Sequence, residues 1–465
     1  MKKYLIIIAV WLQSVFVLFG QNDTTDIYIM HLNDLHAKIN RFPELKHVVD
    51  SIRSCHKNTL LVSAGDLFSG NPYVDKFERP GCPIIKLMKK LHFDVTAIGN
   101  HEFDYGQDVL AQRIKQASFP FICANIVTRR TAIPQPAPFA ILKSGDLSIA
   151  FVSLLQVSKN GLPESHPDKL KNLSFSDPFK IIKKFKFLKK KADICIGLTH
   201  LGIKQDKILA EQNPWLDAII GGHSHTRIDT PIVVNGVPIT QADHYVRDLG
   251  LMHIRYANHQ IVYFHDELIP LRHQIKDSSF VAIVKEVSKN PKFHQIIADL
   301  PYAMDTEQDL GEMMAAAYKE GLQADISFQN SGGVRIKSFP EGPLKIINVY
   351  LLDPFDNEMM LVDMTYKDML SFLRYAYLLR HEKNQWTAGV SVKYITNKNG
   401  ELADIQLFDK DNKLLDKTKT YKVAINSYMA RSYDYSAKDK AQRTHKYSNE
   451  LIIEYLKKHF PLQEK

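Results

Sequence analysis

The segment VTAIGNHEFD at residues 95–104 joins an apolar, β-branched run to a glycine and a group of metal-binding side chains. Four other segments in the first half of the chain also join an apolar run to such side chains: YIMHLNDLH at 28–36, which has no glycine, and LLVSAGD at 60–66, ICIGLTH at 194–200 and AIIGGHSH at 218–225, which do. Apolar β-branched runs bounded by glycine are typical of buried strands in a sheet covered on both faces. Ligands of open α/β sheets bind beyond the carboxyl ends of the strands. The five segments therefore predict side chains that converge at one site.

Seven side chains of these segments are predicted metal ligands, and a pair of divalent ions accounts for all of them. Asp66 is assigned to both ions, because a carboxylate has two oxygens with lone pairs to spare. The other ligands divide into a set for one ion and a set for the second: Asp34, His36 and His225, then Asn100, His200 and His223. Mixed imidazole, carboxylate and amide ligation suits Zn²⁺, Mn²⁺ or Fe and leaves the identity of the metal open. Two such ions roughly 3.5–4 Å apart clamp the attacking and leaving oxygens of a phosphoryl displacement.

This ligand assignment leaves His101 and Asp104 over, and both are predicted to be catalytic. His101 is suited to stabilise charge on the transferring phosphoryl group or to protonate the leaving oxygen, and Asp104 to fix its tautomer. Taken singly, a histidine at a strand end is more often a hydrogen-bonded structural residue than a ligand. The complete set, in this order and at five strand ends, favours a metal site.

These segments resemble the calcineurin-like metallophosphoesterase domain, and the forms NDLH at 33–36 and GNHEFD at 99–104 resemble the 5′-nucleotidase family within it. The resemblance implies an α/β (α+β) fold. In it, a metallophosphoesterase β-sandwich flanked by helices is joined by a helical linker to a smaller α/β substrate-binding domain. The family's C-terminal domain grips a nucleoside, so the second half of the chain tests the resemblance.

The second half carries segments similar to the nucleoside-binding part of that family. NSGGVR at 330–335 resembles its N-x-G-G-I-R segment, PFDN at 354–357 its P-F-G-N segment, and YKVAINSY at 421–428 the strand and turn that bring in a second aromatic residue. Adjacent glycines let a ligand approach the backbone, an arginine fork binds phosphate, and two aromatic rings suit a nucleobase. Taken singly, Phe355 and Tyr428 also fit ordinary core aromatics. The residues predicted to bind substrate are Asn330, Gly332, Gly333, Arg335, Phe355, Tyr428, Asp434 and Lys319.

Three departures from the family pattern bear on the substrate. Lys319 is the candidate substitute for an arginine that the family commonly carries on the preceding helix, and a lysine lacks the arginine fork. Asp356 replaces a glycine, and Ser432-Tyr433 replaces the glycines expected before Asp434, the residue that the resemblance places near a ribose. A missing arginine and an added acid near the pocket weaken the binding of a highly charged substrate such as a nucleoside diphosphate sugar.

Length and composition leave room for two domains. The chain has 465 residues, of which 45% are hydrophobic and 24% charged, as is ordinary for a globular protein. We expect a signal peptide over 1–20, a metallophosphoesterase domain over 24–272, a helical linker over 273–300 and a nucleoside-binding domain over 301–465.

One helix is unusually clear in the sequence. It starts with Asp177 as N-cap and Pro178 at the first position. Its inward residues are Ile181, Ile182, Phe185 and Leu188, and its outer face carries Lys183, Lys184, Lys186, Lys189, Lys190 and Lys191. A solvated helix face explains these lysines better than a nucleic-acid patch does, because the aromatic residues follow the period of the core. No nucleic-acid partner is therefore expected.

The first twenty residues have the form of a secretory signal peptide. Two lysines precede an almost wholly apolar run over residues 4–19, and Gly20 offers a small residue for cleavage. The run is near the lower limit for spanning a bilayer and Gln13 interrupts it, so no stable membrane insertion is expected. The protein is predicted to be exported, either periplasmic or secreted. An oxidising compartment would allow a Cys55–Cys82 disulfide, which the sequence does not decide.

The predicted function is that of an exported dinuclear phosphohydrolase in nucleotide catabolism. It would convert nucleoside 5′-monophosphates, its small-molecule partners, to nucleoside and phosphate. A 2′,3′-cyclic nucleotide phosphodiesterase or a nucleotide-sugar hydrolase is the alternative, because the same metal pair cleaves diesters and anhydrides. A non-catalytic surface binding protein is a third class, which a missing metal ligand would favour, and none of the expected ligands is missing.

Overall fold

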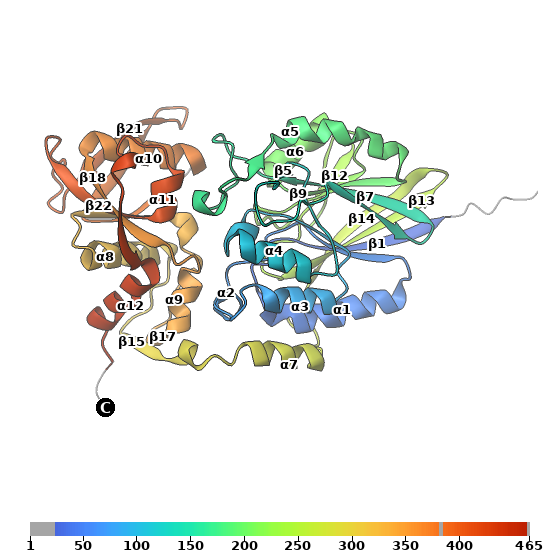
Figure 1. Ribbon diagram of the computed structural model, residues 1–465, viewed down its shortest axis with the longest axis horizontal. Coiled ribbons are helices and arrows are strands. Elements are labelled where there is room, and N and C mark those ends of the chain that lie inside the picture. Colours follow the sequence, from blue (N-terminus) through green and yellow to red (C-terminus); the bar gives the residue numbers. More distant parts are fainter. Residues whose placement is uncertain (1–23, 381–384, 463–465) are drawn as a thin grey trace, which may run out of the picture.

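The structure, a computed structural model, describes residues 24–380 and 385–462, and the predicted signal peptide lies outside them. Figure 1 shows two lobes joined by α7 (Ser278–Val287) along one edge of the molecule. The helix begins where the linker was expected, because the Asp277 side chain accepts a hydrogen bond from the Phe280 N–H at 3.0 Å. Within the described residues, no helix is long and apolar enough to cross a membrane.

Two six-stranded sheets form the centre of the larger lobe, and each has parallel strands in its middle. The first sheet has the order β14-β13-β1-β2-β3-β4, with β14 Gln260–Pro270, β13 Asp248–Ala257, β1 Thr25–Leu32, β2 Thr59–Ser63, β3 Val95–Ala97 and β4 Phe121–Ile122. The second has the order β11-β12-β10-β9-β7-β6, with β11 Ile232–Val234, β12 Val237–Thr240, β10 Ala218–Ile220, β9 Ile194–His200, β7 Leu147–Leu155 and β6 Phe139–Ser144. A small separate pair is β5 Ile126–Val127 with β8 Ser174–Phe175.

All five predicted strand runs are strands, and they are divided between the two sheets of the β-sandwich that the resemblance implied. β1, β2 and β3 lie in the first sheet and β9 and β10 in the second. One buried cluster, which includes Ile29 and Val62 from the first sheet and Ile196 and Ile220 from the second, fills the space between them. A strand in such a sandwich is covered by the other sheet on one face and by helices on the other. Its apolar run therefore looks the same as that of a single sheet covered by helices.

Helices cover the outer face of each sheet. Those on the first sheet are α1 Phe42–Cys55, α3 Cys82–Lys90 and α4 Gln107–Gln116, and those on the second are α5 Pro178–Ile181, the 3-10 helix η4 Ile182–Lys190 and α6 Ile203–Gln212. The predicted start of α5 is confirmed, because the Asp177 side chain accepts a hydrogen bond from the Phe179 N–H at 2.8 Å. The α-helical geometry lasts one turn and then continues as η4.

The smaller lobe is an α/β unit around a five-stranded sheet. The sheet order is β19-β16-β22-β18-β23, with β19 Gln385–Ala388, β16 Ile326–Asn330, β22 Thr420–Asn426, β18 Glu358–Thr365 and β23 Gln442–Tyr447. One face packs against α8 Glu307–Gly321 and α12 Ser448–His459, and the other against α10 Tyr366–Arg380. The remaining strands and α-helices of this lobe are β15 Ile296–Leu300, β17 Gly342–Lys345, α9 Ile346–Leu352, β20 Ser391–Thr396, β21 Leu402–Phe408 and α11 Ser427–Ser432. The predicted fold class is confirmed.

The four cysteines are free in the structure. Cys55 is exposed, whereas Cys82, Cys123 and Cys195 are buried. The undecided pair Cys55–Cys82 is therefore not a disulfide here.

Candidate active site

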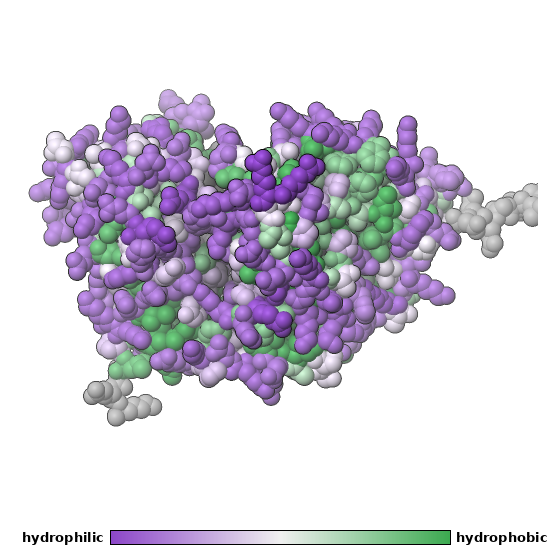
Figure 2. All heavy atoms as spheres, in the orientation of Figure 1, coloured by the Kyte–Doolittle hydropathy of each residue, from purple (hydrophilic) through white to green (hydrophobic). Residues whose placement is uncertain are grey.

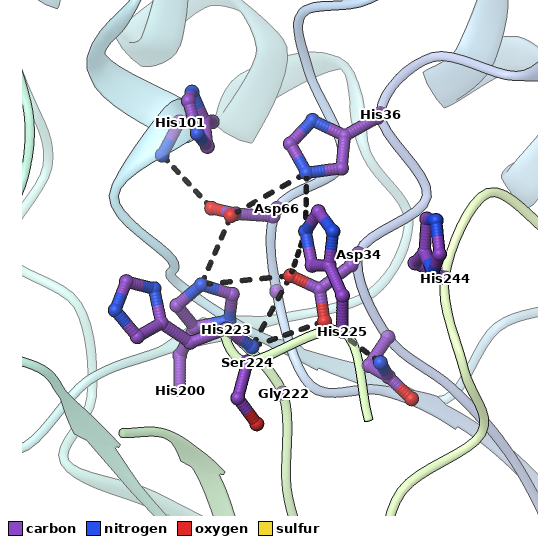
Figure 3. A network of polar contacts seen from close by, with 12 residues as sticks. Asp34, His36, Asp66, His101, His200, Gly222, His223, Ser224, His225 and His244 are labelled. Atoms are coloured by element: carbon purple, nitrogen blue, oxygen red, sulfur yellow. Dashed lines mark hydrogen bonds and ion pairs between the residues drawn. The ribbon is translucent and has the colours of Figure 1, made fainter. Parts of the chain in front are cut away.

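The ends of the five predicted strand segments meet in one place. Figure 3 shows the imidazoles of His36, His200 and His225 gathered around the carboxylates of Asp66 and Asp34. Three groups of side chains place one ligand atom from each member within 4.8 Å of the others: Asp34 with His36 and His225, His36 with Asp66 and His101, and Asp66 with His200 and His223. Asp66 belongs to two of the groups, as its predicted role requires, and one of these also contains His101, which was predicted to be catalytic and not a ligand.

Backbone carbonyls fix the orientation of two of the histidines. His36 Nδ1 lies 2.9 Å from the Ser69 carbonyl oxygen, and His200 Nδ1 lies 2.8 Å from the Ala64 carbonyl oxygen. A carbonyl oxygen only accepts, so Nδ1 carries the proton and Nε2 presents its lone pair to the cluster. His200 Nε2 is buried 3.0 Å from Asp66 Oδ2 and 3.9 Å from Asp34 Oδ1. An imidazole nitrogen and two carboxylates gathered this closely away from water are a donor set that fits a metal ion.

Asn100 is oriented in the same way. Its Nδ2 donates to the Glu164 carbonyl oxygen at 2.9 Å, and its Oδ1 faces His223 Nδ1 at 3.0 Å. The amide oxygen is thus turned toward the imidazole side of the cluster. Burial lowers the pKa of His223 to about 4. The imidazole is therefore neutral at pH 7, which is the form that binds metals.

The backbone at the cluster is strained. Five candidate ligands have positive φ: Asp34 at 50°, His36 at 46°, Asp66 at 53°, His223 at 76° and His225 at 52°. Non-glycine residues rarely adopt this left-handed conformation. Such strain persists where the surrounding structure holds it in place, typically at functional sites. Its concentration on the candidate ligands supports a common role for them.

Two residues outside the predicted set hold the ligands in position. The Glu102 carboxylate is fully buried and accepts the backbone N–H groups of Asp66 at 3.0 Å, Leu67 at 2.6 Å and Gly99 at 2.6 Å. Burial raises the pKa of Glu102 to about 7. Asn33 Nδ2 donates to Asp34 Oδ2 at 2.7 Å. Both residues lie inside the quoted motifs, but their roles are visible only in three dimensions. Glu102 holds the backbone at the end of another strand, and Asn33 holds the neighbouring ligand Asp34.

The predicted catalytic pair is formed. His101 Nδ1 lies 2.6 Å from Asp104 Oδ2, and the Ser69 hydroxyl donates to the same oxygen at 2.6 Å. The His101 backbone N–H donates to Asp66 Oδ1 at 2.8 Å, which ties the pair to the cluster. Burial lowers the pKa of His101, but the carboxylates of Asp104 and Asp66 outweigh it, so the pKa is raised above its ordinary value.

A cavity of about 1030 Å³ lies between the two lobes. Its wall in the larger lobe includes Asp66, Asn100, His101, Asp104, His223 and His225, and its wall in the smaller lobe includes Asn330, Gly332, Gly333, Arg335, Phe355 and Tyr428. Phe355 and Tyr428 are partly exposed side chains of this wall and not buried core residues. The guanidinium carbon of Arg335 lies 5.6 Å from the centre of the Phe355 ring, which also stacks against His101 with ring centres 5.8 Å apart.

Lys319 and Asp434 are not brought to this cavity. Lys319 lies near the end of α8, where its side chain packs beside Gly389 in the turn between β19 and β20. Asp434 is exposed to solvent. Asp434 lies outside the cavity because of its neighbour Tyr433, which stands where a glycine was expected. The Tyr433 ring is buried against Phe372, with ring centres 5.1 Å apart, and anchors this segment outside the cavity.

Other cavity residues had no motif in the sequence. Lys76 lines the cavity and forms an ion pair of 2.6 Å with Asp356 of the other lobe. Glu164, His166 and Lys169 line it from the connection after β7, which includes the short 3-10 helix η3 (Pro167–Lys169), and His166 Nε2 contacts the Ser427 hydroxyl at 3.2 Å. These residues belong to irregular segments, and only the approach of the two lobes makes them part of one wall.

Comparison with known proteins agrees with this geometry. Residues 27–227 match the calcineurin-like phosphoesterase model and residues 289–437 match the 5′-nucleotidase C-terminal domain. Protein UshA of Escherichia coli (strain K12) is 26% identical, with 90% of this chain and 87% of UshA covered, and a 5′-nucleotidase of Vibrio vulnificus is 26% identical over 89% and 86%. The crystal structure of a 5′-nucleotidase precursor from Thermus thermophilus has the same fold, with a TM-score of 0.82, 22% identity and coverage of 94% and 97%.

The fold and the cluster of histidine and carboxylate ligands define a metal-dependent phosphoesterase. With both matched domains present in this order, the chain belongs to the 5′-nucleotidase family.

Proposed function

We propose that this protein hydrolyses nucleoside 5′-monophosphates to nucleoside and phosphate, using two divalent metal ions. The observation that carries the proposal is the composition of the cavity between the lobes. Its wall in the larger lobe has the candidate metal ligands, and its wall in the smaller lobe has Arg335, Phe355 and Tyr428. A nucleotide has a phosphate for the first wall and a base for the second.

The ligand assignment follows the observed groups. One ion would be held by the group of Asp34, His36 and His225, the other by the group of His200 and His223 with the Asn100 oxygen, and Asp66 would serve both. When bound, such ions supply Lewis acidity to the phosphoryl group and make water a nucleophile at neutral pH. The mixed nitrogen and oxygen donors suit Zn²⁺ or Mn²⁺.

The protein's own residues would orient the substrate and move a proton. Phe355 and Tyr428 would hold the base by stacking, and Arg335 would bind phosphate oxygens with its guanidinium. His101 keeps Nδ1–H on Asp104, so its Nε2 is free to give a proton to the leaving 5′ oxygen. The raised pKa of His101 favours the protonated form that this step needs.

A nucleotide-sugar hydrolase or a 2′,3′-cyclic nucleotide phosphodiesterase is the second candidate. The cavity volume of about 1030 Å³ supports it, because small-molecule sites usually measure ~300–1,000 Å³. A larger substrate than a nucleoside monophosphate therefore fits.

A phosphate-release panel distinguishes these functions. Protein loaded with Mn²⁺ is given adenosine monophosphate, 2′,3′-cyclic adenosine monophosphate, uridine diphosphate glucose and p-nitrophenyl phosphate. The proposal expects the highest kcat/KM for the monophosphate, while a preference for the cyclic or sugar substrate supports the second candidate. Equal kcat/KM for aryl phosphate and every nucleotide contradicts the nucleoside grip.

We also propose export through cleavage of residues 1–20 and domain limits at 24–272, 273–300 and 301–465. The charged and apolar pattern of the leader supports export. The linker proposal is supported by α7, which leaves the larger lobe and leads into the smaller one. Mass spectrometry of the mature N-terminus in the exporting host tests the cleavage position.

A further inference from the structure

The lysine-rich segment after Asp177 takes no part in the proposed hydrolysis and has an unusual backbone. After one α-helical turn, residues 182–190 form a 3-10 helix. Such helices seldom exceed three or four residues, and with three residues per turn they align every third side chain. The nine residues therefore form three rows: 182, 185 and 188; 183, 186 and 189; 184, 187 and 190.

The three rows differ sharply in composition. The first packs on the second sheet, with Ile182 and Leu188 buried and Phe185 partly buried. All six side chains of the other two rows are exposed. Five of them are lysines, and the sixth is Phe187, which is 41% exposed. The 3-10 geometry thus separates an inner apolar row from a basic surface that carries one aromatic ring.

The charge of this surface is largely uncompensated. Residues 180–191 contain seven lysines and no acidic residue. Among the described residues, the ion pairs of these lysines amount to Lys189 with Asp217 at 2.6 Å. Like charges one turn apart repel each other, so the segment gains stability beside an anionic surface.

A neighbouring edge strand extends the apolar part. Phe139 of β6 contacts Phe187 edge to face, with ring centres 6.0 Å apart. Ile141 lies two residues further along β6, on the same face as Phe139, and is 39% exposed. Lys143 follows on that face and is exposed. The result is a small apolar centre with lysines around it, at the edge of the larger lobe that carries α5 in Figure 1. Figure 2 shows hydrophilic residues along this edge and hydrophobic residues next to them.

We propose that this surface, which comprises the exposed side chains of residues 180–191 with Ile141 and Lys143, docks the protein peripherally on an anionic lipid bilayer. Clusters of four to eight basic residues on an amphipathic segment attract anionic headgroups, and an exposed Phe inserts at the acyl boundary. A nucleic acid fits less well, because base stacking uses several exposed rings and the two outward rows offer one. None of the surface's residues lines the cavity between the lobes, so docking is independent of the proposed hydrolysis.

Vesicle sedimentation tests the proposal with the mature chain, whose apolar leader is absent. The protein is mixed with phosphatidylcholine vesicles with or without about 40% phosphatidylglycerol. We expect binding to the anionic vesicles alone, lost at about 1 M salt, where the Debye length falls to ~3 Å. The variant K183Q/K184Q/K186Q/K190Q is expected to bind several-hundredfold more weakly, at about fivefold per lysine. F187S is expected to lose roughly three- to eightfold, because Phe187 is 41% exposed and this part of the residue is available for burial.

The control variant K410Q/K413Q/K417Q/K419Q removes the same charge from exposed lysines of the smaller lobe. We expect it to bind vesicles like the unchanged protein, and all variants to keep the same phosphate release. Equal losses in the two fourfold variants would show a net-charge effect and overturn the proposal. Absence of binding to anionic vesicles at low salt would overturn it, and so would tighter binding to a single-stranded DNA oligonucleotide than to the vesicles.

Discussion

Replacing Glu102 by glutamine perturbs the hydrogen bonds that hold the segments after β2 and β3, which carry the candidate ligands Asp66 and Asn100. The buried carboxylate takes three backbone N–H groups, two on Oε2 from Asp66 and Gly99 and one on Oε1 from Leu67. Glutamine has the same shape but one acceptor oxygen. If that oxygen replaces Oε2, the new amide NH₂ faces the Leu67 N–H, and two donors oppose each other.

The expected size follows from the bonds lost. A buried N–H left without an acceptor costs about 1–3 kcal/mol. We therefore expect the free energy of unfolding of Glu102→Gln to fall by about that amount. If the loop relieves the lost hydrogen bond by moving the carboxylate of Asp66, the same free energy raises the activation barrier. In that case kcat/KM falls about 5- to 150-fold, since 1.36 kcal/mol corresponds to a tenfold change in rate.

The assay is phosphate release from adenosine monophosphate at limiting and at saturating Mn²⁺, beside urea denaturation. We expect the loss in kcat/KM to be greatest at limiting metal, because displaced ligands bind the ions less tightly. Glu44→Gln is the matched control: its carboxyl is buried on α1 and contacts Lys276 at 3.6 Å, away from the segments after β2 and β3. Wild-type kcat/KM at limiting Mn²⁺ in Glu102→Gln would refute the positioning role.

Three further changes test other parts of the account. Gly99→Ala puts a methyl group in steric conflict with Asp66 Oδ1, so we expect bound metal, measured by elemental analysis, and activity both to fall at least about tenfold. Phe355→Ala and Tyr428→Ala are each expected to raise KM for adenosine monophosphate roughly 5- to 150-fold, with p-nitrophenyl phosphate little affected, because a base stack contributes ~1–3 kcal/mol. Burial raises the pKa of Asp353 to about 6, so its ionisation destabilises the fold as the pH rises from about 4 through 6. In urea denaturation we therefore expect Asp353→Asn to be about 1–3 kcal/mol more stable than wild type at pH 8, and no more stable than wild type at pH 4.

For each of these changes, one result would contradict the expected effect. Full metal content in Gly99→Ala would show that the close approach to Asp66 is not required. An equal loss on aryl phosphate in the aromatic variants would place their effect outside base binding. The same stability difference at pH 4 and pH 8 for Asp353→Asn would assign it to something other than ionisation.

The larger lobe was predictable to the level of its strands. Runs such as 194–196 and 218–220 are continuous and apolar because both faces of their strands are covered. The same property hides whether a sheet or a helix covers each face, so the runs alone did not show the two sheets, which only the resemblance to a β-sandwich family implied. The candidate ligands were predictable because each follows its strand directly, and the positions of these strands bring them together.

The smaller lobe was less predictable where tertiary packing decides the outcome. Asn330 and Arg335 reach the cavity because their segment leaves β16 at the sheet end. Asp434 does not, because the bulky Tyr433 is drawn into the core beside Phe372. The 3-10 geometry of 182–190 was also hidden, since Ile182, Phe185 and Leu188 are close to an α-helical period as well. No local pattern joins Lys76 to Asp356, which lie in different lobes.

Anomalous diffraction from crystals soaked in Mn²⁺ locates the ions without relying on activity. We expect two peaks separated by about 3.5–4 Å, with Asp66 between them. The remaining ligands should divide as Asp34, His36 and His225 around one peak and Asn100, His200 and His223 around the other. A single peak, or none at these residues in crystals of active protein, would contradict the proposed two-ion site.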